Sequence, residues 1–183
     1  MRKVIAAINM TVDGNCDHTA GLPDDAIHDH YTNLLHEGGV ILYGRKTFQL
    51  MEFWPPLVKN PTGNKSLDDF AVAIDNIPKI VFSHTLKNIS WETAKLADDT
   101  PENTVAALKQ QAGKDIYIGS RSLIIHLLQL NLIDELQLCI HAVVTSGGLP
   151  LAENLQDRKL VTLLRTKTFS SGAVILYYAP AKV

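Results

Sequence analysis

Short apolar runs alternate along this chain with segments whose apolar residues recur at helical spacing. The runs are rich in β-branched residues, and several end at a glycine, which is typical of strands buried on both faces of a sheet. This pattern predicts strands at residues 4–8, 40–43, 80–82, 116–118, 136–144, 160–169 and 173–178.

Capping signals mark the helices between these runs. Pro23-Asp24-Asp25-Ala26 places acids where the dipole of a first helical turn favours them, and Gly38-Gly39 ends that helix. Ser66-Leu67-Asp68-Asp69 is similar to a capping box, and Thr100-Pro101 combines a cap with a proline suited to a first turn. Two further helices are predicted over residues 45–51 and 123–130, and a proline-rich loop over 52–65.

The order of these elements predicts an α/β fold. Strands that alternate with helices indicate a mostly parallel sheet covered on both faces, here a three-layer α-β-α sandwich. The last two predicted strands, joined by a short turn at residues 170–172, add an antiparallel hairpin at one edge. The length of 183 residues suits one domain, residues 1–183. In such sheets ligands bind at the carboxyl ends of the strands, so we examine the turns there.

Composition narrows the class of protein. Hydrophobic residues make up 46% and charged residues 20%, with a formal net charge of -2. A basic excess typical of nucleic-acid modules is missing, as is an apolar run of the ~20 residues that a membrane span needs. The N-terminus lacks the pattern of a signal peptide, and two cysteines cannot form a disulfide framework. We therefore expect a cytoplasmic protein that binds neither nucleic acid nor membrane.

The predicted turns after three strands carry residues suited to phosphate or ribose. Tyr43-Gly44-Arg45-Lys46-Thr47 brings a glycine, two cations and a hydroxyl to a helix start, which favours an anion. Ile118-Gly119-Ser120-Arg121-Ser122 is a second turn of this kind, and a dinucleotide could bridge the two. Phe82-Ser83-His84-Thr85 follows the third strand. The alternative for each is purely structural: a glycine turn with solvated cations, a helix capped by Ser120, and a polar strand end.

The stretch from residue 13 to residue 30 is acidic and rich in histidine. A carboxylate at a helix start beside an apolar pocket can serve as a proton donor, and Asp25 is the candidate. For Asp24 we favour a role in the first turn of the helix. Metal ligation would draw on Cys16, His18, His28 and His30. Their spacing matches no compact zinc pattern, and we expect no native metal site.

Four segments together resemble a known family. They are residues 6–14 (AAINMTVDG), 42–48 (LYGRKTF), 116–120 (IYIGS) and 132–136 (LIDEL). In this order and spacing they are similar to the dihydrofolate reductase-like superfamily, and most similar to its deaminase-reductase branch, which is related to the C-terminal reductase domain of riboflavin biosynthesis. The resemblance covers nearly the whole chain.

The resemblance implies NADPH across the strand ends and a homodimer. Its implied cofactor-binding residues are Ala6, Ala7, Gly44, Arg45, Lys46, Thr47, Ser83, His84, Gly119, Ser120, Arg121 and Ser122. It places Asp25 on the proton-relay acid, and the loop over residues 13–22 is expected to close over the nicotinamide. Asp13, Asp17 and His18 are further substrate-side candidates.

Three departures from the family pattern bear on the substrate and the cofactor. Asp29 stands where an aromatic packs on folate, and Ile77 stands where an arginine grips the folate tail, so folate is not the expected substrate. Ser120 replaces the second glycine of a Gly-Gly pair, which predicts backbone strain at the second phosphate turn.

The leading hypothesis is therefore an NADPH-dependent reductase. It would transfer a hydride to a C=N or C=O bond of a small polar, pteridine- or pyrimidine-like substrate. The alternatives are a catalytically inactive nucleotide-binding or sensor protein on the same fold, and metal-dependent chemistry at the cysteine and histidines named above.

Overall fold

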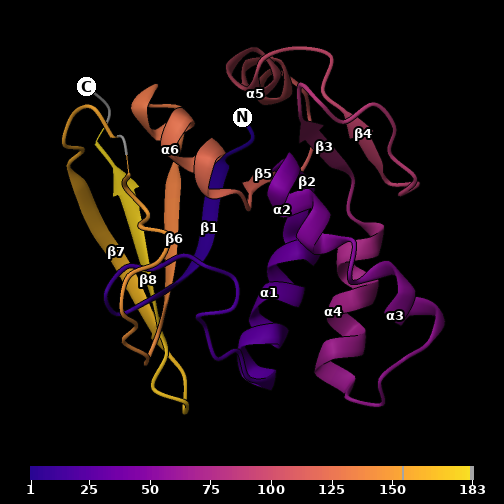
Figure 1. Cartoon of the computed structure of the whole chain (residues 1–183). Helices are drawn as coiled ribbons and strands as arrows, with labels where there is room; N and C mark the ends of the chain where they lie inside the picture. The colour runs from indigo at the N-terminus through magenta and orange to yellow at the C-terminus, as the bar shows by residue number, and fades with distance from the viewer. Residues whose placement is uncertain (154, 182–183) are drawn as a thin grey trace.

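An eight-stranded mixed sheet organises the computed structural model, which describes residues 1–153 and 155–181 (Figure 1). Its strands are β1 (Val4–Thr11), β2 (Gly38–Gly44), β3 (Lys79–Phe82), β4 (Ala94–Leu96), β5 (Asp115–Ile118), β6 (Glu135–His141), β7 (Val161–Thr168) and β8 (Val174–Pro180). They lie in the order β4-β3-β2-β5-β1-β6-β8-β7. Every pair from β4 to β6 is parallel, and β8 and β7 add the antiparallel hairpin at one edge. The predicted fold class is confirmed.

Helices cover both faces of the sheet. They are α1 (Asp25–Glu37), α2 (Arg45–Met51), α3 (Pro55–Lys59), α4 (Lys65–Asn76), α5 (Pro101–Gln110) and α6 (Arg121–Gln129). On one face, Val105 of α5 and Leu127 of α6 pack with alternate β1 residues such as Val4. On the other, Leu35 of α1 and Ile74 of α4 pack in a cluster with Ile5, and Figure 1 shows these two helices side by side. None of the helices in the described ranges is both long and apolar enough to cross a bilayer.

Side-chain caps explain where the helices begin. Asp24 Oδ1 accepts a hydrogen bond from the Ile27 N–H at 2.9 Å, so Asp24 is the N-cap of α1. The predicted start of α4 at Ser66 is wrong by two residues. Asn64 is the cap and accepts from the Leu67 N–H at 3.1 Å, while Ser66 is buried inside the helix.

Two short elements were not predicted. The helix α3 lies within the predicted loop. A proline is tolerated in its first turn, because an N–H group there would have no acceptor within the helix. The strand β4 has three residues, of which Lys95 is exposed, so it carries no apolar run to find. Both elements depend on their neighbours: α3 packs on α4, and β4 pairs with β3.

The strand order places a topological switch point at the centre of the sheet. The chain passes from β1 to β2, and β5 later enters between them. The strand β5 pairs with β1 only from Val4↔Ile116 to Ala6↔Ile118, whereas β1 continues along β6 to Thr11. Residues 7–11 therefore extend past the end of β5, directly beside the turn at Gly119. This open edge of β1 lies where ligands of such sheets bind.

Candidate functional site

The two predicted phosphate turns meet at the carboxyl ends of β2 and β5. The backbone N–H of Gly44 donates a hydrogen bond to Ser120 Oγ at 2.8 Å. A Cβ atom added at Gly44 would lie 3.4 Å from Ser122 Oγ, so the turns are in contact. At Gly119 an added Cβ would lie 2.8 Å from Cε1 of Tyr43. The backbone passes so close to this ring that only glycine fits without a shift.

Two structural predictions for Ser120, a side-chain cap of α6 and a strained backbone, are wrong. Its side chain makes no capping hydrogen bond to α6, although Ser120 occupies the N-cap position. Its φ of -115° and ψ of 124° are those of extended backbone, so the strain predicted for a serine here is absent. The hydroxyl is instead buried and holds the other turn.

The cations of the first turn are available to an anion. Arg45 and Lys46 are exposed at the start of α2, and neither forms an ion pair within the described residues. Arg121 of the second turn differs, because its Nη1 lies 3.2 Å from Glu153 Oε2 and also donates to the Pro150 carbonyl. The positive charge of the site is thus concentrated at Arg45 and Lys46, beside the half-buried Thr47.

The third turn and the two alanines take separate places. Ser83 Oγ accepts from the backbone N–H groups of Thr85 and Leu86, at 3.2 and 2.9 Å, while His84 is exposed. Ala6 is fully buried in the core on the α5–α6 side, whereas Ala7 is half-buried at the open edge of β1. Of the two alanines, Ala7 is the one that a ligand at this edge can reach.

Local hydrogen bonds hold the loop after β1. Asp13 Oδ1 accepts from Thr11 Oγ1 at 2.6 Å and from the Thr145 N–H at 3.1 Å, and these bonds lower the pKa of the Asp13 carboxyl. Asp17 accepts from the side chain and the backbone of Thr19. His18 lies exposed, with Nδ1 3.6 Å from Asp17. All three predicted substrate-side residues therefore shape or border this loop.

The loop is also tied to the segment that follows β6. Buried Asn15 accepts from the Leu149 N–H at 2.8 Å, and the Cys16 N–H donates to the Leu149 carbonyl at the same distance. A Cβ atom at Gly148 would come within 2.2 Å of the Asn15 side chain. Two segments far apart in the sequence thus hold each other in place beside the end of β1.

Asp25 lies in the first turn of α1 with an exposed side chain. Its Oδ1 accepts a hydrogen bond from Asn64 Nδ2 at 3.0 Å, which links the starts of α1 and α4. The favoured interpretation of Asp24 as a first-turn residue is close to what the structure shows, because Asp24 caps the helix.

The four candidate metal ligands do not converge. His28 packs against Trp54 and Phe70, whereas His30 packs against Phe169 of the C-terminal hairpin region. Burial raises the pKa of the Cys16 thiol to about 11, so this cysteine is protonated at neutral pH. Among residues 1–153 and 155–181, no three His, Cys, Asp or Glu side chains are grouped to hold a metal ion.

A polar cluster beside the open edge of β1 was missed by the sequence analysis. Asn9 of β1 bonds to His141 of β6 and to Tyr31 of α1, at 3.0 and 3.1 Å, and His141 also contacts the backbone of Leu22. The available signal was the alternation along β6, where Glu135, Gln137, Cys139 and His141 share one face. The sequence analysis predicted this segment only as a strand and assigned no function to its polar residues.

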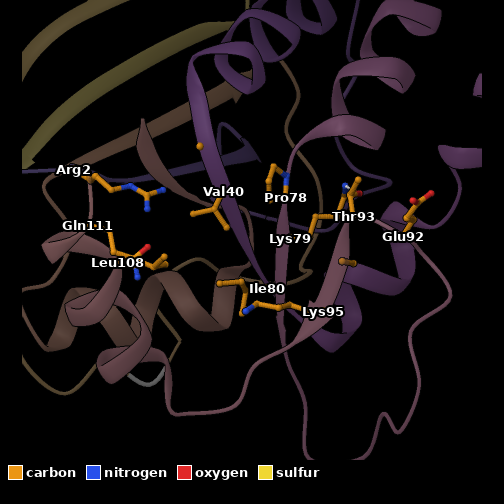
Figure 2. A pocket seen from close by; sticks show the side chains of 12 residues that line it. Arg2, Val40, Pro78, Lys79, Ile80, Glu92, Thr93, Lys95, Leu108 and Gln111 are labelled. Carbon is orange, nitrogen blue, oxygen red and sulfur yellow. Dashed lines mark hydrogen bonds between the residues drawn. The ribbon is translucent and has the colours of Figure 1, made fainter. Parts of the chain in front are cut away.

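A separate cavity of about 370 Å³ lies at the amino ends of β2 and β3, on the side of the sheet away from the two turns (Figure 2). Val40, Ile80 and Lys95 are among its lining residues. Lys79 also borders it, but its ammonium donates to the Ile77 carbonyl at 2.8 Å and to Thr93 Oγ1 at 2.7 Å. Burial lowers the pKa of Lys79 to about 8. This buried lysine is therefore occupied in joining α4, β3 and β4.

A family model described as the RibD C-terminal domain matches residues 2–175. The uncharacterized protein YyaP of Bacillus subtilis (strain 168) is 35% identical over 181 residues, covering 97% of this chain and 94% of that protein.

Two solved structures illustrate the fold. A putative riboflavin biosynthesis protein from Shewanella sp. PV-4 has a TM-score of 0.72 at 16% identity, with 100% of both chains covered. A diaminohydroxyphosphoribosylaminopyrimidine deaminase/5-amino-6-(5-phosphoribosylamino)uracil reductase from Thermotoga maritima has a TM-score of 0.67 at 15% identity, covering 98% of this chain and 57% of that one. These likenesses show that the chain shares the fold of these two proteins.

Proposed function

The chain belongs to the RibD C-terminal domain family, and on that premise we propose that it is an NADPH-dependent reductase of a small pyrimidine- or pteridine-like compound. The observation that carries the proposal is the junction of two glycine turns through Gly44 and Ser120, beside Arg45 and Lys46, which form no ion pair with the described residues. The solved Thermotoga maritima protein is named as a uracil-derivative reductase, which supports a pyrimidine substrate.

The residues present fit a phosphorylated dinucleotide. Arg45 and Lys46 would hold its phosphates, because both cations are exposed and without an acidic partner in the described chain. Thr47, Gly119 and Ser122 would contribute from the same two turns, and Ser83 and His84 from the turn after the neighbouring strand. The open edge of β1 at Ala7 would receive the nicotinamide. Arg121, neutralised by Glu153, contributes less charge to this site.

When bound, NADPH supplies a hydride to the carbon of the C=N or C=O bond. The chain must then position the substrate and deliver a proton to its nitrogen or oxygen. Asp25 is our proposed proton donor, directly or through a water molecule. Asp25 can deliver a proton only when it carries one, and Oδ2 is available to carry it because Asn64 Nδ2 bonds to Oδ1.

Calorimetric titration with NADPH and NADH tests the cofactor assignment. We expect NADPH to bind more tightly than NADH, and the double variant Arg45→Gln/Lys46→Gln to lose that preference. The control is Lys59→Gln, because Lys59 is an exposed lysine on the nearby helix α3. Equal binding of both cofactors to the wild type, or no binding, would reject a site specific for the 2′-phosphate.

The role of Asp25 is tested by Asp25→Asn, which preserves size and removes the titratable proton. We expect unchanged NADPH affinity and a turnover of 5-amino-6-(5-phosphoribosylamino)uracil that is lower by about 10²-fold or more. Glu37→Gln, an exposed change at the other end of the same helix, is the control. Equal turnover by wild type and Asp25→Asn would show that the proton comes from elsewhere.

The exposure of Asp25 and its bond to Asn64 favour one alternative, a nucleotide-binding or sensor protein without hydride transfer. Tight binding of NADPH with no oxidation across a panel of pyrimidines, pteridines, imines and carbonyls would support it. A single turnover of any of these compounds would reject it.

We also propose that the protein is a homodimer, the assembly that the family resemblance implies. The edge strand β7 supports this, since its residues are exposed along their whole length and include Val161, Leu163 and Leu164. Light scattering should give twice the chain mass of 20.2 kDa. A monomer mass at micromolar concentration would contradict the proposal. The cytoplasmic location stays a prediction.

A further inference from the structure

We propose that Asn9 is a specificity-determining residue whose Nδ2 amide donates a hydrogen bond to the substrate. The substrate would present an acceptor there, a ring carbonyl oxygen or an unprotonated ring nitrogen, next to the bond that is reduced. This inference rests on the proposed function and assigns part of its substrate recognition to a residue of β1.

The argument begins with His141, a buried histidine with 2% of its surface exposed. The backbone N–H of Leu22 points at its Nδ1 at a distance of 3.2 Å. A backbone N–H can only donate, so Nδ1 must accept and carries no proton. Burial lowers the pKa of His141, which keeps the ring neutral. A neutral imidazole with an unprotonated Nδ1 bears its proton on Nε2.

This tautomer determines the orientation of Asn9. His141 Nε2 lies 3.0 Å from Asn9 Oδ1 and donates to it. The opposite amide orientation would place the Nδ2 hydrogens of Asn9 against the Nε2 hydrogen of His141, two donors facing each other. The backbone N–H of Leu22 therefore fixes the tautomer of His141, and His141 in turn fixes the orientation of the Asn9 amide.

Tyr31 strengthens the same orientation. Its hydroxyl donates to Asn9 Oδ1 at 3.1 Å. Burial raises the pKa of this phenol well above its usual value, so the hydroxyl keeps its proton. Asn9 Oδ1 thus accepts from two side chains, one from α1 and one from β6, and is fully occupied.

The Nδ2 amide of Asn9 has no hydrogen-bond partner within the described chain, and Asn9 is an exposed residue. It lies two residues beyond Ala7, on the same face of β1 and past the last residue that pairs with β5. The donor is therefore presented at the open edge where the nicotinamide would bind. Because His141 and Tyr31 hold the amide before any ligand arrives, little ordering cost remains on binding.

Neutrality of the cluster indicates the class of acceptor. Asn9, the phenol of Tyr31 and the neutral imidazole of His141 carry no charge, so the cluster suits a neutral oxygen or nitrogen. A uracil or pterin ring offers carbonyl oxygens of this kind, whereas a substrate with only donors at this position would leave Asn9 unsatisfied. That difference is the source of the discrimination.

The experiment uses the side-chain amide signals of Asn9 in NMR spectra of the ¹⁵N-labelled full-length protein, assigned by their loss in Asn9→Asp. On titration with 5,6-diaminouracil we expect these signals to shift, and Asn9→Asp to weaken binding of the probe by at least about tenfold. Asn33→Asp, an exposed change on α1, should bind like the wild type. Unmoved Asn9 signals, or equal binding by Asn9→Asp, would overturn the proposal.

Two further measurements test the orientation of the Asn9 amide, and a third separates the role of Asn9 from the proposed reductase activity. Tyr31→Phe should weaken binding of the probe less than Asn9→Asp, because it loosens the amide without removing the donor. The ¹⁵N shifts of His141 should report a proton on Nε2, and a proton on Nδ1 would refute the orientation argument. NADPH titration is run in parallel: failure to bind NADPH with a clear Asn9 response rejects the reductase, not the Asn9 assignment.

Discussion

The Gly44 N–H and Ser120 Oγ are joined at 2.8 Å across 76 residues of sequence. The bond connects the turns after two adjacent strands, β2 and β5, and its acceptor is buried. The two turns therefore hold their relative position through the protein itself. A dinucleotide that bridged them would meet a surface already arranged for it.

Removing that acceptor should reduce stability. Ser120→Ala leaves the partly buried Gly44 N–H without its partner, and we expect a loss of about 1–3 kcal/mol in the free energy of unfolding. Urea denaturation measures this. Ser122→Ala is the matched control, because Ser122 is exposed in the same turn and should change stability little. Equal effects of the two variants would mean that the bond between the turns contributes nothing.

The close approach at Gly119 makes a second prediction about the same junction. Gly119→Ala would place a Cβ 2.8 Å from the buried ring of Tyr43, so either the ring or β5 must move, at a cost of about 1–3 kcal/mol. Gly44→Ala is the comparison, since its Cβ would make only ordinary contact, at 3.4 Å. Thermal unfolding of both variants checks the order. A lower Tm for Gly44→Ala than for Gly119→Ala would contradict it.

The ion pair between Lys109 and Asp134 should matter more than an exposed one. Lys109 Nζ lies 2.6 Å from Asp134 Oδ2, and each side chain is only 16% exposed. Asp134 Oδ2 also accepts from the Val4 N–H, which ties the pair to the start of β1. Lys109→Ala removes this cation from a mostly buried carboxylate, and we expect a loss of about 3 kcal/mol in the free energy of unfolding.

The matched control for that pair is Lys65→Ala. Lys65 pairs with Asp69 on the surface of α4, where solvent screens the attraction, so denaturation should show little change. Similar losses in the two lysine variants would show that burial does not distinguish these pairs.

Stability should fall as the pH is lowered from about 6.5 to about 4. Burial, with further contributions from Lys167 and Arg165, lowers the pKa of His30 to about 4. Between the ordinary pKa of about 6.5 and this value, the unfolded chain binds a proton that the folded chain refuses. The expected loss by pH 4 is about 2–3 kcal/mol from this residue.

Denaturation of wild type and His30→Gln across that range measures the effect. The variant should show a shallower dependence on pH, because it removes the titrating group. His36→Gln, an exposed change on the same helix, should retain the dependence of the wild type. Identical pH profiles for wild type and His30→Gln would contradict the prediction.

Local pattern was sufficient for most of the fold. The strands at 40–43, 80–82 and 116–118 lie within β2, β3 and β5, because strands buried on both faces need continuous apolar runs. The start of α4 was misplaced because Ser66 and Asn64 are both plausible caps. The folded backbone is extended at Asn64 and helical from Lys65 onward, and this makes Asn64 the cap. The strand β4 exists by virtue of pairing with β3, which no local signal reports.

The candidate site divides in the same way. Glycines and cations after apolar runs identified Gly44, Arg45 and Gly119 from the sequence alone, since a turn after a buried strand is a local event. The partners of each side chain were not local. Arg121 was expected to face the cofactor, yet Glu153 holds it, and the two lie 32 residues apart.

By itself, the sequence determined the order of the strands and helices other than α3 and β4, the turns that carry charge and hydroxyl groups, and the family. The tertiary structure alone decided that Ser120 joins two turns, that Asp25 meets Asn64, and that Asn9, Tyr31 and His141 form one polar cluster. The reason is physical. Secondary structure follows from residues within a few positions of one another, whereas the direction of a hydrogen bond depends on groups that only the folded sheet brings together.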